Sequence, residues 1–190
     1  MFPAAEWNSL ELAKLVVGAA TPILLAFIGI FVARAARRVE ERQWLNQKLI
    51  ERRLALYEEM APKLNDIYAS LTLRGHFKEV TPPEVIKRKR DVDRTFYAHA
   101  PLFSNDFRAA YHAFADTCFS HYSGVGEDAK LRADRRTQQV ERRKAEWQRD
   151  WDAMFDDQAV SSPKEFDEAY NRLMDAFSGD VGVPTEEQSS

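Results

Sequence analysis

The stretch that decides the architecture is LVVGAATPILLAFIGIFVARAARR, which runs from Leu15 to Arg38. Between Lys14 and Arg34 lie 19 residues without a charge. As a helix rising about 1.5 Å per residue they extend roughly 28 Å, close to the hydrocarbon thickness of a bilayer. A domain of this size could hardly cover such a helix on every side. The stretch therefore predicts that residues 1–34 hold an N-terminal segment and one transmembrane helix.

The charges around this stretch favour a permanent anchor over a cleaved signal peptide, and they set its orientation. The segment before it carries two acidic residues and Lys14, whereas a signal peptide begins with a basic region. Four arginines follow the stretch, namely Arg34, Arg37, Arg38 and Arg42. The positive-inside rule then places the N-terminus outside the membrane and the bulk of the chain in the cytoplasm.

Small residues form a stripe along the predicted span. They fall within about 80° of one another on a helical wheel, and they are Gly18, Pro22, Ala26, Gly29 and Ala33. Gly29 and Ala33 are a small-xxx-small pair, which lets two helix backbones approach closely in a membrane. We therefore expect the chain to form a homo-oligomer through this face, although glycine and alanine are also common in membrane helices without such a role.

A helical pattern continues after the arginines without a break. Leu45, Leu56 and Ile67 recur every eleven residues, which places them in one nearly straight stripe. This spacing predicts one long helix from about residue 34 to residue 73, kinked at Pro62. The alternative is two shorter helices that meet there.

Capping signals mark three further helices, which begin after Thr81, Ser104 and Ser162. We therefore predict an all-α chain, in which one N-terminal transmembrane helix continues into a long helix and a cytoplasmic bundle of four or five helices. The bundle is expected to occupy residues 35–178. Residues 179–190 are expected to form a disordered tail.

The region between the third and last of these helices is harder to interpret. Residues 127–139 are almost all polar, which predicts a mobile loop or an exposed helix. Helical spacing resumes with apolar residues that we expect to face inward, namely Val140, Trp147, Trp151 and Phe155. No stretch of the sequence shows the alternation of a β-strand.

Few residue patterns point to chemistry. The net charge of −3 gives no general attraction to nucleic acid, and Cys118 stands alone, so it is expected to be a small core residue. We find no metal-ligand spacing and no phosphate-binding loop, and we expect neither a metal nor a cofactor. The basic run at 87–90 could touch lipid headgroups or RNA, but a solvated helix surface is the favoured interpretation.

One short motif resembles a known family. The stretch RTFYAH, from Arg94 to His99, resembles the R-x4-6-H motif of the HEPN superfamily, whose small helical members include ribonucleases. The resemblance implies a metal-independent ribonuclease with His99 as general acid or base and Arg94 stabilising phosphorane-like charge. On a helix the two residues lie about 140° apart, so they converge only if the helix unwinds near Pro101.

The chain as a whole is similar to a group of small uncharacterised bacterial proteins with one N-terminal membrane helix. This resemblance implies a location in the bacterial inner membrane and no particular activity. We expect a membrane-anchored oligomer that acts as a cytoplasmic interaction module, binding a protein partner, or as a gated membrane assembly. The alternatives are a membrane-tethered HEPN-like ribonuclease, for which the resemblance implies a role in bacterial defence, and a membrane-disrupting pore.

Overall fold

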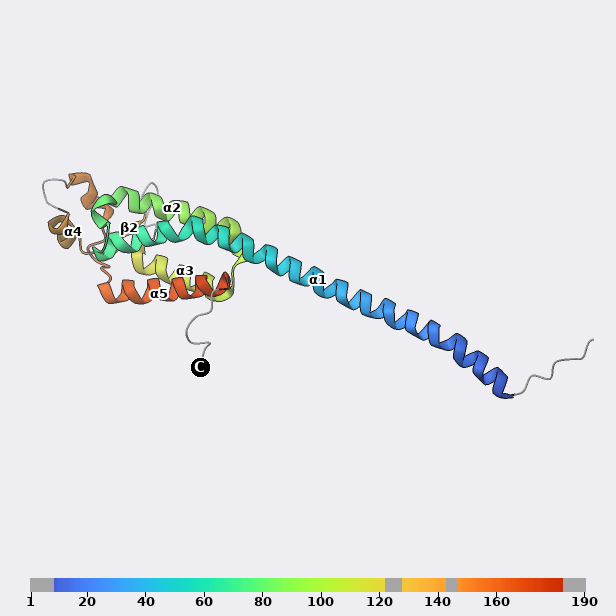
Figure 1. Cartoon of the computed structure of the whole chain (residues 1–190). Helices are drawn as coiled ribbons and strands as arrows, with labels where there is room; N and C mark the ends of the chain where they lie inside the picture. The colour runs from blue at the N-terminus through green and yellow to red at the C-terminus, as the bar shows by residue number, and fades with distance from the viewer. Residues whose placement is uncertain (1–8, 122–127, 143–146, 183–190) are drawn as a thin grey trace, which may run out of the picture. The chain divides into compact units, whose positions relative to one another are not determined.

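The computed structural model describes residues 9–121, 128–142 and 147–182, and almost all of them are helical (Figure 1). Within the first helix, the side chains outside this description are those of residues 9–13, 15–17, 19–26 and 41. The chain divides into two compact units, residues 1–48 and residues 49–190. The predicted all-α class is confirmed, and each unit is described separately below.

The first described element is α1, an α-helix from Ser9 to Thr72. It remains α-helical at Pro62, so the alternative of two shorter helices meeting at this proline is wrong. It ends close to the predicted boundary. Leu73 has a left-handed backbone (φ 58°), and the amide of Arg74 donates to the carbonyl of Ala69 at 3.0 Å, which closes the last turn of the helix.

In the part of the chain that the structure describes, no helix combines the length and the apolar character that crossing a membrane requires. Most side chains of the predicted span fall outside the described residues. Pro22 and Ala26 are among them, whereas Gly18, Gly29 and Ala33 are described and exposed. The transmembrane helix in residues 1–34 stays a prediction.

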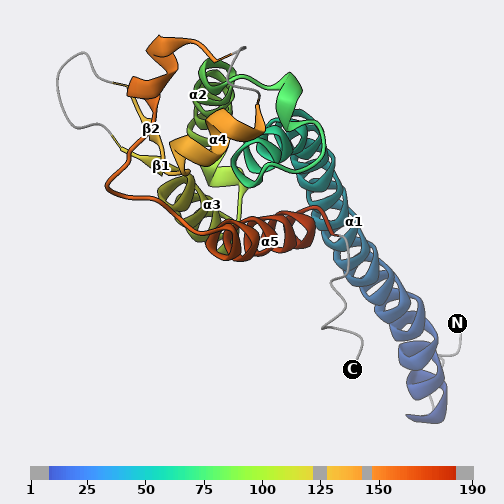
Figure 2. The same cartoon turned by 90° about the vertical axis from the view of Figure 1, so that its left-hand side faces the viewer.

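The second unit is a helical bundle. Its long elements are the C-terminal part of α1, α2 (Pro82–His99), α3 (Asn105–Cys118) and α5 (Pro163–Asp180), which lie side by side (Figures 1 and 2). Short 3-10 helices, η1 (Phe77–Glu79) and η2 (Ala100–Leu102), join the first three of them. A bundle with four long helices agrees with the predicted four or five.

The three predicted N-terminal caps are confirmed. At the start of α2 the amide of Thr81 donates to the Glu84 carboxylate at 2.7 Å, and Ser162 and Glu165 form the same capping box before α5. The hydroxyl of Ser104 accepts a hydrogen bond from an amide in the first turn of α3 at 3.1 Å. These caps satisfy amides that a helix leaves unpaired at its beginning.

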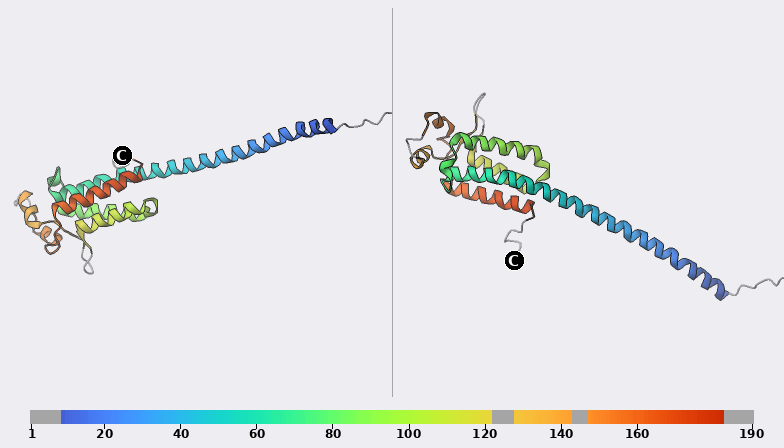
Figure 3. Two further views of the ribbon diagram at one scale, coloured as in Figure 1. Left: turned by 90° about the horizontal axis from the view of Figure 1, so that it is seen from below. Right: turned by 45° about the horizontal axis from the view of Figure 1, so that its top comes forward.

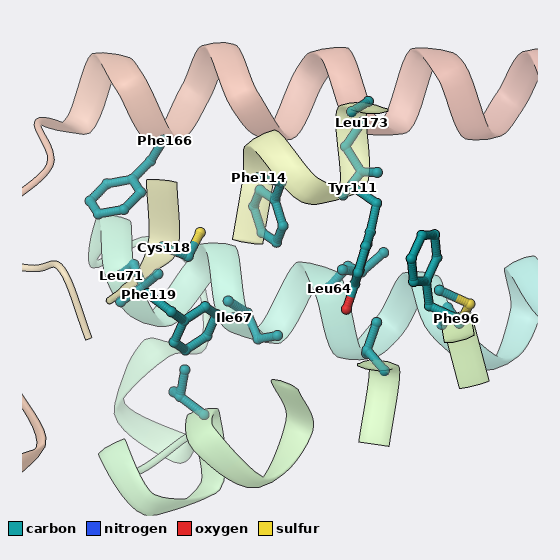
Figure 4. Close-up of a cluster of buried hydrophobic side chains, with 14 of the residues drawn as sticks. Leu64, Ile67, Leu71, Phe96, Tyr111, Phe114, Cys118, Phe119, Phe166 and Leu173 are labelled. Carbon is teal, nitrogen blue, oxygen red and sulfur yellow. The ribbon is translucent and has the colours of Figure 1, made fainter. Parts of the chain in front are cut away.

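The core of the bundle surrounds one face of α1. Leu56, Met60, Leu64 and Ile67 are each at most 2% exposed, and they meet apolar side chains from α2, α3 and α5 (Figure 4). Cys118 is fully buried in this cluster, as predicted. Burial raises the pKa of the Cys118 thiol well above its ordinary value, which keeps the thiol protonated.

The polar stretch at 127–139 is only partly the expected exposed loop or helix, and the prediction that no strand occurs is wrong. Strand β2 (Lys130–Leu131) pairs antiparallel with β1 (Phe119–Ser120), and a seven-residue helix, α4 (Arg135–Glu141), follows. Two apolar side chains cause the difference, because Leu131 and Ala133 are each only 2% exposed and hold this stretch against the core.

Two further expectations for the C-terminal half are wrong. Val140 is 71% exposed, and Trp151 lies in a 3-10 helix, η3 (Arg149–Met154), instead of continuing an α-helix. The predicted tail also begins too early, because α5 extends to Asp180 and this residue is buried. Its carboxylate accepts a hydrogen bond from the amide of Ser104 at 2.8 Å and lies 3.6 Å from Arg53.

Because Asp180 joins α5 to the start of α3 and to α1, we expect Asp180→Ala to lower the free energy of unfolding by about 2 kcal/mol. The substitution leaves the Ser104 amide without its acceptor and removes the carboxylate beside Arg53, whose guanidinium keeps its hydrogen bonds to the carbonyls of Leu102 and residue 180. Urea denaturation of the full-length protein in mild detergent, followed by circular dichroism, measures the change.

The matched control is Asp175→Ala, which removes an exposed carboxylate from the same helix. It should change the free energy of unfolding by less than about 0.5 kcal/mol. Equal effects of the two substitutions would show that Asp180 does not hold the helices together.

Candidate functional site

The structure does not bring Arg94 and His99 together as a catalytic pair. Both residues lie on α2, which stays α-helical up to His99, so they face directions about 140° apart. The Arg94 guanidinium is 82% exposed and lies 4.0 Å from Asp91. The unwinding near Pro101 that their convergence requires begins only after His99, in η2.

A different arginine contacts His99. The guanidinium of Arg52, on α1, lies 3.0 Å from Nε2 of His99, and Nδ1 of His99 lies 2.9 Å from the carbonyl of Thr95. A guanidinium only donates and a carbonyl only accepts, so Nε2 accepts and Nδ1 carries the proton. Both ring nitrogens of His99 therefore have a partner within the fold.

The other histidines serve local contacts. His76 lies 2.6 Å from Asp66, which also accepts from Arg88 at 2.6 Å. Burial alone would raise the pKa of Asp66, but these two hydrogen bonds outweigh it and leave the pKa below its ordinary value. His121 lies 2.5 Å from Asp116 at the surface. Among the described residues, no three His, Cys, Asp or Glu side chains gather to hold a metal ion.

Most of the basic run at 87–90 is neutralised by aspartates. Arg88 pairs with Asp66 at 2.6 Å, Lys89 pairs with Asp93 at 2.6 Å, and Arg90 pairs with Asp128. A surface that attracts phosphate groups needs positive charge that is not already paired. The pairing supports the interpretation of this run as a solvated helix surface.

A cleft of the bundle lies where α1 ends, between α4 and the start of α5. Figure 3 shows α4 at this end of the bundle. The cleft has a volume of about 430 Å³. Its apolar lining comes from Leu71, Leu73, Ala133, Val160, Pro163 and Phe166. Polar side chains at its lining include Thr72, Asp134, Thr137, Gln138, Ser162 and Glu165. Its size and mostly apolar lining suit a small apolar group or the side chains of a bound peptide.

A buried polar network holds one wall of this cleft in place. The amide nitrogen of Gln138 donates to the carbonyl of Ser70 at 2.9 Å, and its oxygen accepts from Nε of Arg142 at 2.8 Å. Arg142 also donates to the carbonyl of Val80 at 2.6 Å and to the hydroxyl of Ser70 at 2.7 Å. The network therefore ties α4 to the last turn of α1, whose carbonyls have no helical partner of their own.

Arg142 carries its charge in the interior without a carboxylate among these partners. Burial lowers the pKa of its guanidinium to about 10, and the more distant Glu84 offsets this only in part. The sequence predicted no role for Gln138 or Arg142, because both fall in or beside the stretch expected to be exposed. The one local signal is Asp134, whose carboxylate caps α4 by accepting from the amide of Arg136 at 2.8 Å.

A second hollow, of about 440 Å³, is polar. It includes Asp156 and Asp157, which already have partners. Asp156 accepts a hydrogen bond from Ser120, and Asp157 pairs with Arg135 at 3.0 Å. The carboxylates of this hollow are used within the fold, so the apolar cleft is the stronger candidate for binding a partner.

The chain matches no protein-family model, no curated protein and no solved structure. The two resemblances noted from the sequence therefore stay predictions, and the function must be argued from the described residues alone.

We expect Arg142→Met to lower the free energy of unfolding by about 2–3 kcal/mol, because three buried acceptors lose their donor. The control is Arg136→Met, which changes an exposed arginine of α4, the helix that Arg142 directly follows, and should be nearly neutral. Urea denaturation of the full-length protein provides both values, and equal values would contradict a structural role for the network.

The pH dependence gives a second test of the same residue. The folded-state pKa of Arg142 is lowered, so the unfolded chain binds more protons than the folded chain above about pH 10. The contribution of Arg142 to stability should therefore rise with pH in this range. The difference in unfolding free energy between wild type and Arg142→Met should grow from about pH 9 to about pH 11.

Proposed function

We propose that the chain is a membrane-anchored oligomeric helical protein whose bundle acts as a cytoplasmic interaction module. By the resemblance to bacterial single-pass proteins, its membrane is the bacterial inner membrane. The observation that carries the proposal is the exposure of large apolar side chains in the first unit. Phe27 is 69% exposed, Phe31 is 75% exposed and Val32 is 58% exposed.

These apolar side chains cover more of the helix than one stripe. At 100° per residue, the five apolar positions Phe27, Ile28, Ile30, Phe31 and Val32 spread over about 200° of the circumference, and Gly29 and Ala33 lie in the remaining arc. A single partner helix covers one stripe of a helix and would leave the others in water. A lipid environment covers all sides at once, which supports the membrane anchor.

The second unit supports an interaction role over catalysis. Within the described residues, the candidate catalytic histidine is held by Arg52 and the carboxylates of the polar hollow are engaged in the fold. The apolar cleft beside α4 remains as a preformed place for a partner. Its exposed rim includes Val160, an apolar residue that is 47% exposed. We infer that a cytoplasmic protein partner binds there through a short apolar segment.

The anchor predicts a clear effect of charges placed within the uncharged stretch. We expect the double substitution Leu24→Arg with Ile28→Arg to remove the full-length protein from the membrane fraction, since each arginine near the middle of a span costs about 2.5–3.5 kcal/mol. Alkaline carbonate extraction of bacterial membranes, followed by immunoblotting, measures the retained fraction.

The control is Val39→Arg with Trp44→Arg. It adds the same charge at two exposed apolar positions of α1 that lie beyond the arginines. This variant should stay in the membrane fraction with the wild type. A wild-type protein that carbonate releases, or a Leu24/Ile28 variant that stays embedded, would contradict the anchor.

The small-residue stripe also predicts the effect of larger side chains at Gly29 and Ala33, the two stripe positions nearest the arginines. We expect Gly29→Leu with Ala33→Leu to convert the oligomer to monomer, because the added side chains keep two backbones apart. A Cβ at Gly29 would meet nothing within 4 Å in the chain itself, so the substitution does not disturb the helix that carries it. Native mass in mild detergent reports the state as multiples of the 21.9 kDa chain.

The control is Phe31→Leu, which changes a side chain about 160–200° away from the stripe and should leave the oligomer intact. A monomeric wild type would contradict the oligomer. Leakage of a dye from vesicles that depends on Gly29 and Ala33 would instead favour the pore. RNA cleavage that His99→Ala abolishes and His121→Ala preserves would favour the ribonuclease.

A further inference from the structure

Four arginines follow the uncharged stretch within nine residues, namely Arg34, Arg37, Arg38 and Arg42, and we refer to them as the arginine collar. All four side chains are exposed. Among the described side chains, none of the four has a carboxylate within 4.0 Å, and the nearby Glu40 is itself exposed. Among the described side chains, the collar is therefore a concentration of positive charge without a carboxylate partner, and the side chain of Glu41, which lies within it, is outside the described residues.

The basic residues of the bundle behave differently. Arg88, Lys89 and Arg90 each pair with an aspartate. The protein thus contains two segments with four basic residues each. In the run at 87–90 three of the four charges pair with aspartates, whereas the collar has no carboxylate partner among the described side chains. The collar is therefore open to an anionic partner from outside the chain.

The spacing of the collar fits a membrane interface. Arg34, Arg37 and Arg38 extend over about 6 Å along the helix axis, which matches the depth of a headgroup layer, and Arg42 lies about 6 Å further on, beyond that layer. The headgroup region of a bilayer is roughly 5–8 Å deep on each side of the hydrocarbon core. The four residues occupy an arc of about 140° on the helical wheel, so several headgroups can approach from one side.

We propose that the arginine collar binds the anionic phosphodiester headgroups of the cytoplasmic leaflet. The proposal rests on the membrane anchor argued above. Every member of the collar is arginine, and the guanidinium fork makes two parallel hydrogen bonds to a phosphate, which an ammonium group cannot make.

Lipid is a better occupant than free phosphate or nucleic acid because of what lies next to the collar. Phe31 and Val32 are 75% and 58% exposed and lie three and two residues before Arg34. An anionic ligand that binds the collar must therefore accommodate a strongly apolar surface at its edge. A phospholipid provides both, since its acyl chains cover Phe31 and Val32 and its phosphate meets the arginines.

The test measures the lipid that stays with the protein. Full-length protein is reconstituted into bilayers of equal phosphatidylglycerol and phosphatidylcholine, extracted in mild detergent and purified, and the bound lipid is quantified by mass spectrometry. We expect the wild type to retain phosphatidylglycerol at roughly threefold excess over phosphatidylcholine, because each arginine near an anionic surface adds attraction.

Two variants and one control separate the contribution of positive charge from that of the guanidinium fork. Changing all four collar arginines to glutamine should bring the ratio to about one, and changing them to lysine should lower it only partway, since charge remains and the fork is lost. The control changes four exposed basic residues of the bundle to glutamine, and these are Lys87, Arg136, Arg149 and Lys164. This set should keep the wild-type ratio.

The outcomes distinguish the two proposals. A wild type that does not enter the bilayer contradicts the anchor itself. If the wild type inserts but retains both lipids equally, the collar proposal is overturned and the anchor proposal is unaffected. If the four-glutamine variant keeps the wild-type lipid ratio, the collar proposal is also overturned. If the four-lysine variant keeps that ratio, the proposed role of the guanidinium fork is overturned. The lysine set keeps the positive-inside signal, so its result does not depend on a change in orientation.

Discussion

The burial of one face of α1 between residues 56 and 71 is the interaction on which the bundle depends. Met60 and Leu64 are at most 1% exposed, and α2, α3 and α5 all bury apolar residues against this face. A fully buried leucine or methionine contributes about 1.5–3 kcal/mol, so this stripe outweighs any single polar contact in the unit. The Gln138–Arg142 network and the Asp180 contacts then fix how the shorter elements lie on the core.

The features that the sequence predicted correctly depend on local rules. The caps at Thr81, Ser104 and Ser162 follow from which side chains can accept a hydrogen bond at a helix start. The eleven-residue spacing identified Leu56 and Ile67 as core residues. The same rule did not separate them from Leu45, which is 59% exposed, because periodicity shows which residues share a face but not where the bundle begins.

The features that the sequence did not predict depend on contacts between distant residues. Arg52 is 47 positions from His99, so the pairing of these two residues leaves no local pattern. Arg142 is 72 positions from Ser70, and its charge led us to expect exposure when it is in fact 6% exposed. The cleft beside α4 has the same origin, because its walls come from three segments that only the fold brings together.

The contrast between the two units is the strongest physical argument for their different surroundings. In the bundle, large apolar side chains such as Phe107 and Phe177 are fully buried and most of the basic run is paired with aspartates. In the first unit, Phe27 and Phe31 are largely exposed, and no collar arginine has a carboxylate partner among the described side chains. Exposed apolar side chains are unfavourable in water, whereas exposed arginines are well solvated there. The membrane anchor that we propose would cover the apolar side chains with its interior and place the arginines at its anionic surface.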